Sequence, residues 1–376
     1  MKSENICKAI CCGCAACSAI CPVGAITMQE DKRGFMIPVI DESVCIECGA
    51  CQKICNSQND FHDVKEALIA KHKNGNVYLT SQSGGAFTAL SDIILAKHGV
   101  VYGAVIDDHH ELVHIRATSE IERNRMRGSK YTPSYIGDVY SLLEHDLKEG
   151  RKVLFSGTPC QVAGILKYVK VKKLIERNLY TVDILCHGVP SILLWRKMKE
   201  YYEKKYNCSV NKIELRTTSK SERPAMCYCI NESCIPDAVH RKLYYSNLAL
   251  RPSCYHCQYT SIRRIGDFTI GDAWGVKEHN PSFADGRGVS IILINTKKVN
   301  NLRNDIQKDM YIEDVQLRDY TQQSMKASAV PKRAPEDFWK DFDNKSFSYI
   351  IEKYAKHNIF LNIRYIISRL IRIVLR

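Results

Sequence analysis

Hydrophobic and polar positions alternate in two different ways along the chain. In residues 25–40, "AITMQEDKRGFMIPVI", two apolar segments flank Gly34, which predicts a short β-hairpin. Residues 56–65 are polar and show no periodicity, so we interpret them as a linker. After the linker, short apolar runs typical of buried strands alternate with longer segments that have the periodicity of amphipathic helices.

This alternation of strands and helices predicts a largely parallel sheet that is covered by helices. The expected strands are residues 66–72, 100–106, 151–157 and 179–186, and the expected helices are residues 83–99, 160–169 and 190–206. We expect Ser83 to cap the first of these helices and Gly99 to end it. Residues 205–295 are less regular and richer in short apolar runs, so we expect a mixed α/β region there.

The C-terminal segment 358–376 places branched aliphatic side chains on one side of a helical wheel and its four arginines on the other. Residues 351–376 hold six Lys/Arg and one glutamate, a balance of +5. The arginines interrupt the apolar run too often for a spanning helix, which needs about 20 apolar residues. Two interpretations stay open: a helix in an anionic membrane interface, and a helix docked on its own domain or on a partner.

Cysteines form an internal repeat near the N-terminus. The first run reads C-x2-C-x2-C-x3-C, is followed by Pro22, and consists of Cys11, Cys14, Cys17 and Cys21. The second run lies 34 positions later and consists of Cys45, Cys48, Cys51 and Cys55. This is the spacing of bacterial ferredoxins that bind two [4Fe–4S] clusters. Asn56 stands where the second run would usually carry proline.

In such ferredoxins the fourth cysteine of each run ligates the cluster of the other run. We therefore assign two sets of ligands. The cluster one thiols are those of Cys11, Cys14, Cys17 and Cys55, and the cluster two thiols are those of Cys45, Cys48, Cys51 and Cys21. Zinc is the alternative, although zinc sites usually take two CxxC pairs or a Cys/His mixture. Disulfides are not expected, because "MKSENICKAI" lacks the apolar stretch of an export signal.

Composition agrees with a metal-binding globular protein. The chain has 376 residues, enough for two or more domains, and its 18 cysteines suggest metal rather than disulfides. We expect a cytoplasmic location, where such clusters persist. The net charge is +13, and residues 1–60 carry −2, so the remainder carries +15. A basic body can steer phosphate-bearing cofactors, an acidic redox partner or an anionic membrane; no nucleic-acid motif is present, so we expect no nucleic-acid partner.

A second group of cysteines follows predicted strands. Cys160 and Cys186 come after strands that are joined by one helix, so both should lie at the ligand-binding edge of the sheet. Cys254 and Cys257 form a CxxC. The four together are either a four-thiolate site, here called the body site, or inert buried thiols. The remaining cysteines are predicted not to be ligands: Cys7, Cys12, Cys208, Cys227, Cys229 and Cys234.

Six motifs occur in order: "SQSGGAFTAL", "RGSKY", "GTPCQVAGIL", "DILCHGVPS", "RPSCYHCQY" and "DFTIGDAWG". Together they resemble the family of coenzyme deazaflavin hydrogenase/dehydrogenase beta subunits, in its form with an N-terminal ferredoxin domain, over roughly residues 5–300. The resemblance implies FAD in the α/β body and a third [4Fe–4S] cluster on the body site. It does not by itself carry over the deazaflavin donor, and relatives with this layout often occur near surface-polysaccharide genes.

A flavin pyrophosphate needs backbone N–H donors, and Ser83, Gly84 and Gly85 supply them at a predicted helix N-terminus. The alternative is an ordinary serine cap followed by turn glycines. Lys130 either pairs with a phosphate or is a solvated surface lysine. His187, Asp272 and Trp274 lie in the same motifs, but we assign no catalytic residue.

The sequence thus predicts an α+β ferredoxin-like domain with two [4Fe–4S] clusters at residues 1–60, a mixed α/β flavin-binding domain at 65–340, and a basic amphipathic helix at 341–376. The predicted function is an iron–sulfur flavoprotein oxidoreductase that relays electrons to or from an unidentified substrate, in or near surface-polysaccharide metabolism. The alternatives are a non-enzymatic electron-transfer protein that docks a partner reductase, and one component of a deazaflavin-dependent oxidoreductase. The expected partner is a redox protein or a small molecule, with peripheral membrane contact through the tail.

Overall fold

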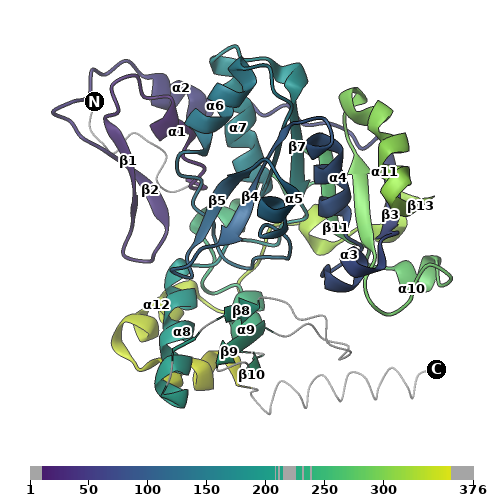
Figure 1. Cartoon of the computed structure of the whole chain (residues 1–376). Helices are drawn as coiled ribbons and strands as arrows, with labels where there is room; N and C mark the ends of the chain where they lie inside the picture. Colours follow the sequence, from purple (N-terminus) through teal and green to yellow (C-terminus); the bar gives the residue numbers. More distant parts are fainter. Residues whose placement is uncertain are drawn as a thin grey trace. The chain divides into compact units, whose positions relative to one another are not determined.

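The structure is a computed structural model that describes residues 11–207, 209–210, 212–214, 226–230, 233–237 and 239–356 (Figure 1). The described residues form two compact units. The first contains those of 11–192 and 250–329, and the second contains those of 193–249 and 330–356. The tail segment 358–376 lies outside the described residues.

The N-terminal part is a hairpin with two short helices. Strands β1 (Ile26–Glu30) and β2 (Met36–Ile40) pair antiparallel, which confirms the hairpin expected around Gly34. The cysteine repeat is also a structural repeat. Helix α1 (Ala16–Ala19) follows Ala15 in the left-handed conformation (φ 63°), and α2 (Ala50–Asn56) follows Gly49 (φ 70°), which lies 34 positions later.

An eight-stranded sheet forms the centre of the first unit, in the order β13-β3-β12-β11-β7-β6-β4-β5. Strands β4, β6, β7 and β11 run parallel to one another, and β3 has the same direction because both β3 and β11 pair antiparallel with β12. Strands β5 and β13 run antiparallel at the two edges. The strands are β3 (Glu66–His72), β4 (Val100–Ile106), β5 (Leu112–Ala117), β6 (Val153–Gly157), β7 (Leu179–Ile184), β11 (Phe268–Asp272), β12 (Ser290–Ile294) and β13 (Met310–Asp314).

Helices cover both faces of this sheet. Because side chains alternate along a strand, Val100 and Tyr102 of β4 pack toward α6 and α7, whereas Val101 and Val105 pack toward α4 and α11. The α6–α7 layer also contains Ala15, Ala16 and Ile54 of the N-terminal part, so the ferredoxin-type segment packs directly on this face. The helices of this unit are α3 (Gly75–Thr80), α4 (Ala86–Leu95), α5 (Glu120–Asn124), α6 (Val139–Lys148), α7 (Pro159–Val171), α10 (Val276–His279) and α11 (Arg303–Asp309).

One helix begins later than the sequence predicts. Helix α4 starts at Ala86, after Gly85 in the left-handed conformation (φ 85°), and it ends at Leu95. The expectation that Ser83 caps this helix is therefore wrong. The reason is tertiary: the carbonyl of Gly84 accepts a hydrogen bond from the backbone N–H of His72 (2.8 Å), which ties this stretch to the end of β3.

The second unit contains helix α8 (Ile192–Tyr206) from Leu193 on and a small antiparallel sheet in the order β10-β9-β8. The remaining elements are β8 (Lys212–Glu214), β9 (Met226–Ile230), β10 (Ser233–Asp237), α9 (Val239–Tyr245), α12 (Pro335–Asn344), α13 (Phe347–Ile350) and a π-helical turn at Ile351–Ala355. Among the described residues, no helix combines the length and the hydropathy that a membrane crossing requires.

Candidate iron–sulfur site

The four cluster two thiols lie around one cavity. Its lining includes Cys45, Cys48 and Cys51 of the second cysteine run together with Cys21 of the first. The structure thus brings together the four thiols that the ferredoxin pattern assigns to cluster two. Apolar side chains, among them that of Ile26, complete the lining. Among the described residues, no group of three or more Cys, His, Asp or Glu side chains is spaced to hold a single metal ion.

The cluster one thiols lie beside this cavity. Burial, together with the neighbouring thiols of Cys11 and Cys55, raises the pKa of Cys17 to about 12. The backbone N–H of Gly13 donates a hydrogen bond to the Cys11 sulfur (3.4 Å), as expected of a sulfur that ligates a cluster. Hydrogen bonding with the Cys12 thiol and burial raise the pKa of Cys14, and the nearby Cys17 thiol raises it further.

Cys14 is held against the α/β body. The hydroxyl of Tyr140 on α6 donates a hydrogen bond to the Cys14 carbonyl (2.7 Å). Gly164 on α7 lies under the same residue: a Cβ at this position would come within 2.6 Å of the Tyr140 oxygen and 3.0 Å of the Cys14 Cβ. The glycine therefore makes room for Cys14, a predicted cluster one thiol, on the helix that carries Cys160.

The body site comes together from three separate segments. Cys160 lies in the first turn of α7, and Cys186 follows β7 by two residues. Cys254 lies in the 3-10 helix Pro252–His256, and Cys257 ends it. Burial raises the pKa of Cys186 to about 12, with further contributions from the thiols of Cys254 and Cys257. The structure thus brings the four sequence-predicted thiols near one another, at the edge where β6 and β7 end.

Cys12 joins the two groups of thiols, although the sequence predicts that it is not a ligand. Hydrogen bonds with the thiols of Cys14 and Cys160 hold the pKa of Cys12 well below its usual value. Its side chain therefore contacts one cluster one thiol and one body-site thiol. Sequence spacing contains no signal for this contact, because Cys12 is out of frame with the run and the contact depends on how the N-terminal part packs on α7.

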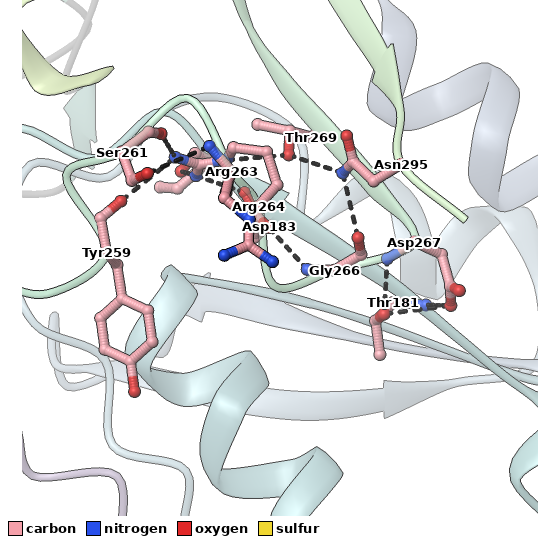
Figure 2. A network of polar contacts seen from close by, with 11 residues as sticks. Thr181, Asp183, Tyr259, Ser261, Arg263, Arg264, Gly266, Asp267, Thr269 and Asn295 are labelled. Carbon is pink, nitrogen blue, oxygen red and sulfur yellow. Dashed lines mark hydrogen bonds and ion pairs between the residues drawn. The ribbon is translucent and has the colours of Figure 1, made fainter. Parts of the chain in front are cut away.

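A buried ion pair supports the end of β7, as Figure 2 shows. Arg264 donates to the Asp183 carboxylate at 2.5 Å, and both side chains are at most 2% exposed. Arg264 also donates to the carbonyl of Tyr259 (3.2 Å), and Asp183 accepts from the backbone N–H of Gly266 (2.8 Å). This network joins β7 to the segment after Cys257, so it fixes the spacing between two parts of the body site.

The residues predicted to hold a flavin pyrophosphate are also packed against the sheet. A Cβ at Gly84 would come within 1.9 Å of the Ala70 carbonyl oxygen, so close packing on β3 is one reason for a glycine here. Among the described residues, the buried hydroxyl of Ser83 finds no hydrogen-bond partner. Gly85 provides the left-handed conformation that precedes α4. Of these three residues, Ser83 has spare hydrogen-bonding capacity.

Lys130 lies close to the same loop. The backbone N–H of Ser129 donates to the Gln82 side-chain oxygen (2.5 Å), so the motifs "SQSGG" and "RGSKY" are adjacent. The Lys130 ammonium donates to the carbonyls of Met126 (2.5 Å) and Arg127 (3.0 Å). Burial lowers the pKa of Lys130 to about 7. Of the two interpretations that the sequence allowed for Lys130, the solvated surface lysine is therefore wrong.

Comparisons with known proteins agree with the order of the motifs. Residues 150–319 match the C-terminal region of the family of coenzyme F420 hydrogenase/dehydrogenase beta subunits, and residues 10–59 match the 4Fe-4S dicluster domain. Both matches confirm the resemblance that the sequence motifs indicated, since F420 is a deazaflavin.

Two curated proteins with names that refer to F420 are similar to this chain. A component of the F(420)H(2) dehydrogenase of Methanosarcina mazei is 25% identical over 294 residues, which is 72% of this chain and 79% of the relative. The coenzyme F420-dependent sulfite reductase of Methanocaldococcus jannaschii is 25% identical over 170 residues, which is 44% of this chain and 26% of the relative. A solved structure of the F420-reducing [NiFe] hydrogenase complex from Methanosarcina barkeri covers 68% of this chain and 85% of its own, with 18% identity and a TM-score of 0.46.

Proposed function

Because residues 150–319 match the family of coenzyme F420 hydrogenase/dehydrogenase beta subunits and follow a 4Fe-4S dicluster domain, we propose that this chain is an iron–sulfur oxidoreductase that serves as the electron-transfer component of a larger redox complex. Its two ferredoxin-type clusters are held by the cluster one and cluster two thiols. A third cluster is held by the body site, and the chain exchanges electrons with a deazaflavin-type or flavin-type carrier.

One observation carries this proposal: the thiols form a continuous series from the N-terminal part into the body. Cys17 packs together with Cys21 and Cys51 of the cluster two thiols. Cys14 contacts Cys12, and Cys12 contacts Cys160 of the body site. Inert core cysteines have no reason to form such a series, whereas electron transfer needs closely spaced redox centres.

The donor set also fits the chemistry of the groups proposed to bind there. A [4Fe–4S] cluster supplies one-electron transfer, and a flavin or deazaflavin supplies hydride exchange. The chain's own contribution is to present the half-buried thiols of the body site and to donate backbone hydrogen bonds to the sulfurs of Cys11 and Cys254 (both 3.4 Å).

For the carrier we propose FAD bound between the loop of Ser83 and the loop of Lys130, with reduced coenzyme F420 as the outside donor. The unpartnered Ser83 hydroxyl and the partly buried Lys130 ammonium support a phosphate-bearing ligand at these adjacent loops. The names of both curated relatives refer to coenzyme F420, and this is the reason for proposing the donor.

The test uses anaerobically purified full-length protein. The cofactor released on denaturation is identified by chromatography, and the protein, with and without added FAD, is mixed with reduced coenzyme F420 while the cluster absorbance is followed. We expect FAD in the released fraction and bleaching of the cluster absorbance. If dithionite bleaches the clusters but reduced F420 does not, with or without FAD, the chain is instead a non-enzymatic electron carrier.

A further inference from the structure

Arg251 is a buried cation that has no carboxylate partner among the described residues. Its side chain is 4% exposed, and within the described part of the chain no carboxylate forms an ion pair with it, while its Nε finds no hydrogen-bond partner. In the part of the chain that the structure describes, the two other buried arginines are both paired, Arg123 with Asp92 (2.6 Å) and Arg264 with Asp183 (2.5 Å). An uncompensated buried charge is strongly unfavourable, so the position of Arg251 calls for an anion that belongs to the site.

The contacts of Arg251 place it between the N-terminal part and the body site. Its Nη1 donates to the backbone carbonyls of Cys11 (3.3 Å) and Met36 (3.1 Å), and its guanidinium lies 4.9 Å from the centre of the Phe35 ring. Gly13 packs so closely on the guanidinium that a Cβ there would be 2.8 Å from Nη2. The loop that carries Cys11 and Gly13 therefore contacts the Arg251 guanidinium directly.

The backbone of Arg251 belongs to the body site. Its N–H donates to the Val189 carbonyl (2.8 Å), and Arg251 is the N-cap residue of the 3-10 helix that carries Cys254. The Arg251 guanidinium thus lies against the backbone of Cys11, and its main chain begins the helix that carries Cys254 of the body site.

We propose that Arg251 is the counter-charge of the iron–sulfur clusters held by the body site and by the cluster one thiols, and that it raises their reduction potentials. The inference rests on the proposed function, because it needs clusters at these thiols. A nearby cation stabilises the reduced form, which carries one more negative charge, more than the oxidised form. Arg251 is in this sense a positioning and tuning residue that does not itself touch a substrate.

A purely structural role makes a different prediction. If Arg251 only ties the Cys11 loop to the body through its two carbonyl contacts, the donor groups matter and the charge does not. Arg251→Gln keeps an N–H donor and removes the charge, whereas Arg251→Lys keeps the charge and removes the planar guanidinium. The two variants therefore separate the two roles. Arg303→Gln, which removes one positive charge from the pair with Glu66 and Asp314, serves as the matched control.

The measurement is a potentiometric titration of the full-length, anaerobically prepared protein followed by electron paramagnetic resonance, with iron content determined on the same samples. We expect Arg251→Gln to shift at least one cluster to a more negative midpoint potential, and Arg251→Lys and Arg303→Gln to keep the wild-type potentials. Unchanged potentials in Arg251→Gln, or an equal shift in Arg251→Lys, would overturn the proposal.

Iron content covers the case in which a variant loses a cluster. If Arg251→Gln loses iron while Arg251→Lys keeps both iron and potential, the charge is what the site needs, and the proposal stands. If Arg251→Lys loses iron as well, the guanidinium is structural and the proposal fails. The iron content of the wild-type protein tests the third cluster separately, so the failure of the proposed function is distinguishable from the failure of this inference.

Discussion

Gly164 offers a direct test of how the N-terminal part is held on the body. A Cβ at this position would lie 2.6 Å from the Tyr140 oxygen and 3.1 Å from the Cys14 sulfur. Tyr140 is 3% exposed and its hydroxyl is hydrogen-bonded to the Cys14 carbonyl, so the ring has no space into which it can move. In Gly164→Ala, either Tyr140 or Cys14 must therefore shift.

The expected magnitude follows from three contributions. Overpacking of a buried site costs about 1–3 kcal/mol, and disruption of the Tyr140–Cys14 hydrogen bond costs about 0.5–1.5 kcal/mol. The higher helix propensity of alanine returns about 1 kcal/mol. We therefore expect Gly164→Ala to lose about 2 kcal/mol of stability and to lose iron from cluster one faster than the wild-type protein.

The assay compares anaerobic thermal denaturation and iron retention at one scan rate. Gly75→Ala is the matched control, because Gly75 lies in α3 with no atom within 4 Å of the added Cβ. Tyr140→Phe removes the atom that clashes, so alanine at 164 should cost less in that background. The reasoning is refuted if Gly164→Ala denatures and retains iron like Gly75→Ala, or if Tyr140→Phe leaves the cost of the alanine unchanged.

Three further predictions concern single groups of the first unit. Burial lowers the pKa of Lys130 to about 7 from an ordinary value of about 10.4, so the unfolded chain holds this proton between about pH 7 and 10 while the folded chain does not. Stability should therefore rise with pH across this window, and Lys130→Met should flatten the rise in denaturation experiments. Cys12→Ala should keep the full iron content, because four other thiols form the body site; a missing cluster in the iron assay would identify Cys12 as a ligand. Asp183→Asn leaves Arg264 buried without its partner and should destabilise the protein by about 3–5 kcal/mol in chemical denaturation; a loss below about 1 kcal/mol would show that the pair is not needed.

The elements that sequence patterns predicted well are those defined by local signals. The strands expected at residues 66–72 and 100–106 have the same bounds in the structure, because each is an apolar run with polar or glycine residues at its ends. The hairpin around Gly34 followed in the same way from two apolar segments and a turn residue. The start of α4 could not be predicted locally, because the packing of Gly84 on β3 decides where the helix begins.

In the candidate site too, features set by local sequence signals were predicted, and features set by tertiary packing were not. Spacing alone predicted that Cys21 lies beside the cysteines of the second run, because the ferredoxin pattern is encoded in sequence. Spacing did not predict the contact between Cys12 and Cys160. The two residues are far apart in the sequence and meet only because the N-terminal part packs on α7. Nor did spacing predict Arg251, because nothing in "RPSCYHC" distinguishes a buried unpaired arginine from an exposed one.

The central claim is that the body site holds a third cluster, and the number of irons per chain tests it most directly. Iron and acid-labile sulfide are counted in anaerobically purified wild-type protein, in Cys257→Ser and in Cys208→Ser, whose cysteine is predicted not to be a ligand. With four irons per cluster, the account predicts about twelve irons for the wild-type protein and for Cys208→Ser, and about eight for Cys257→Ser. About eight irons in the wild-type protein, or an unchanged count in Cys257→Ser, would contradict it.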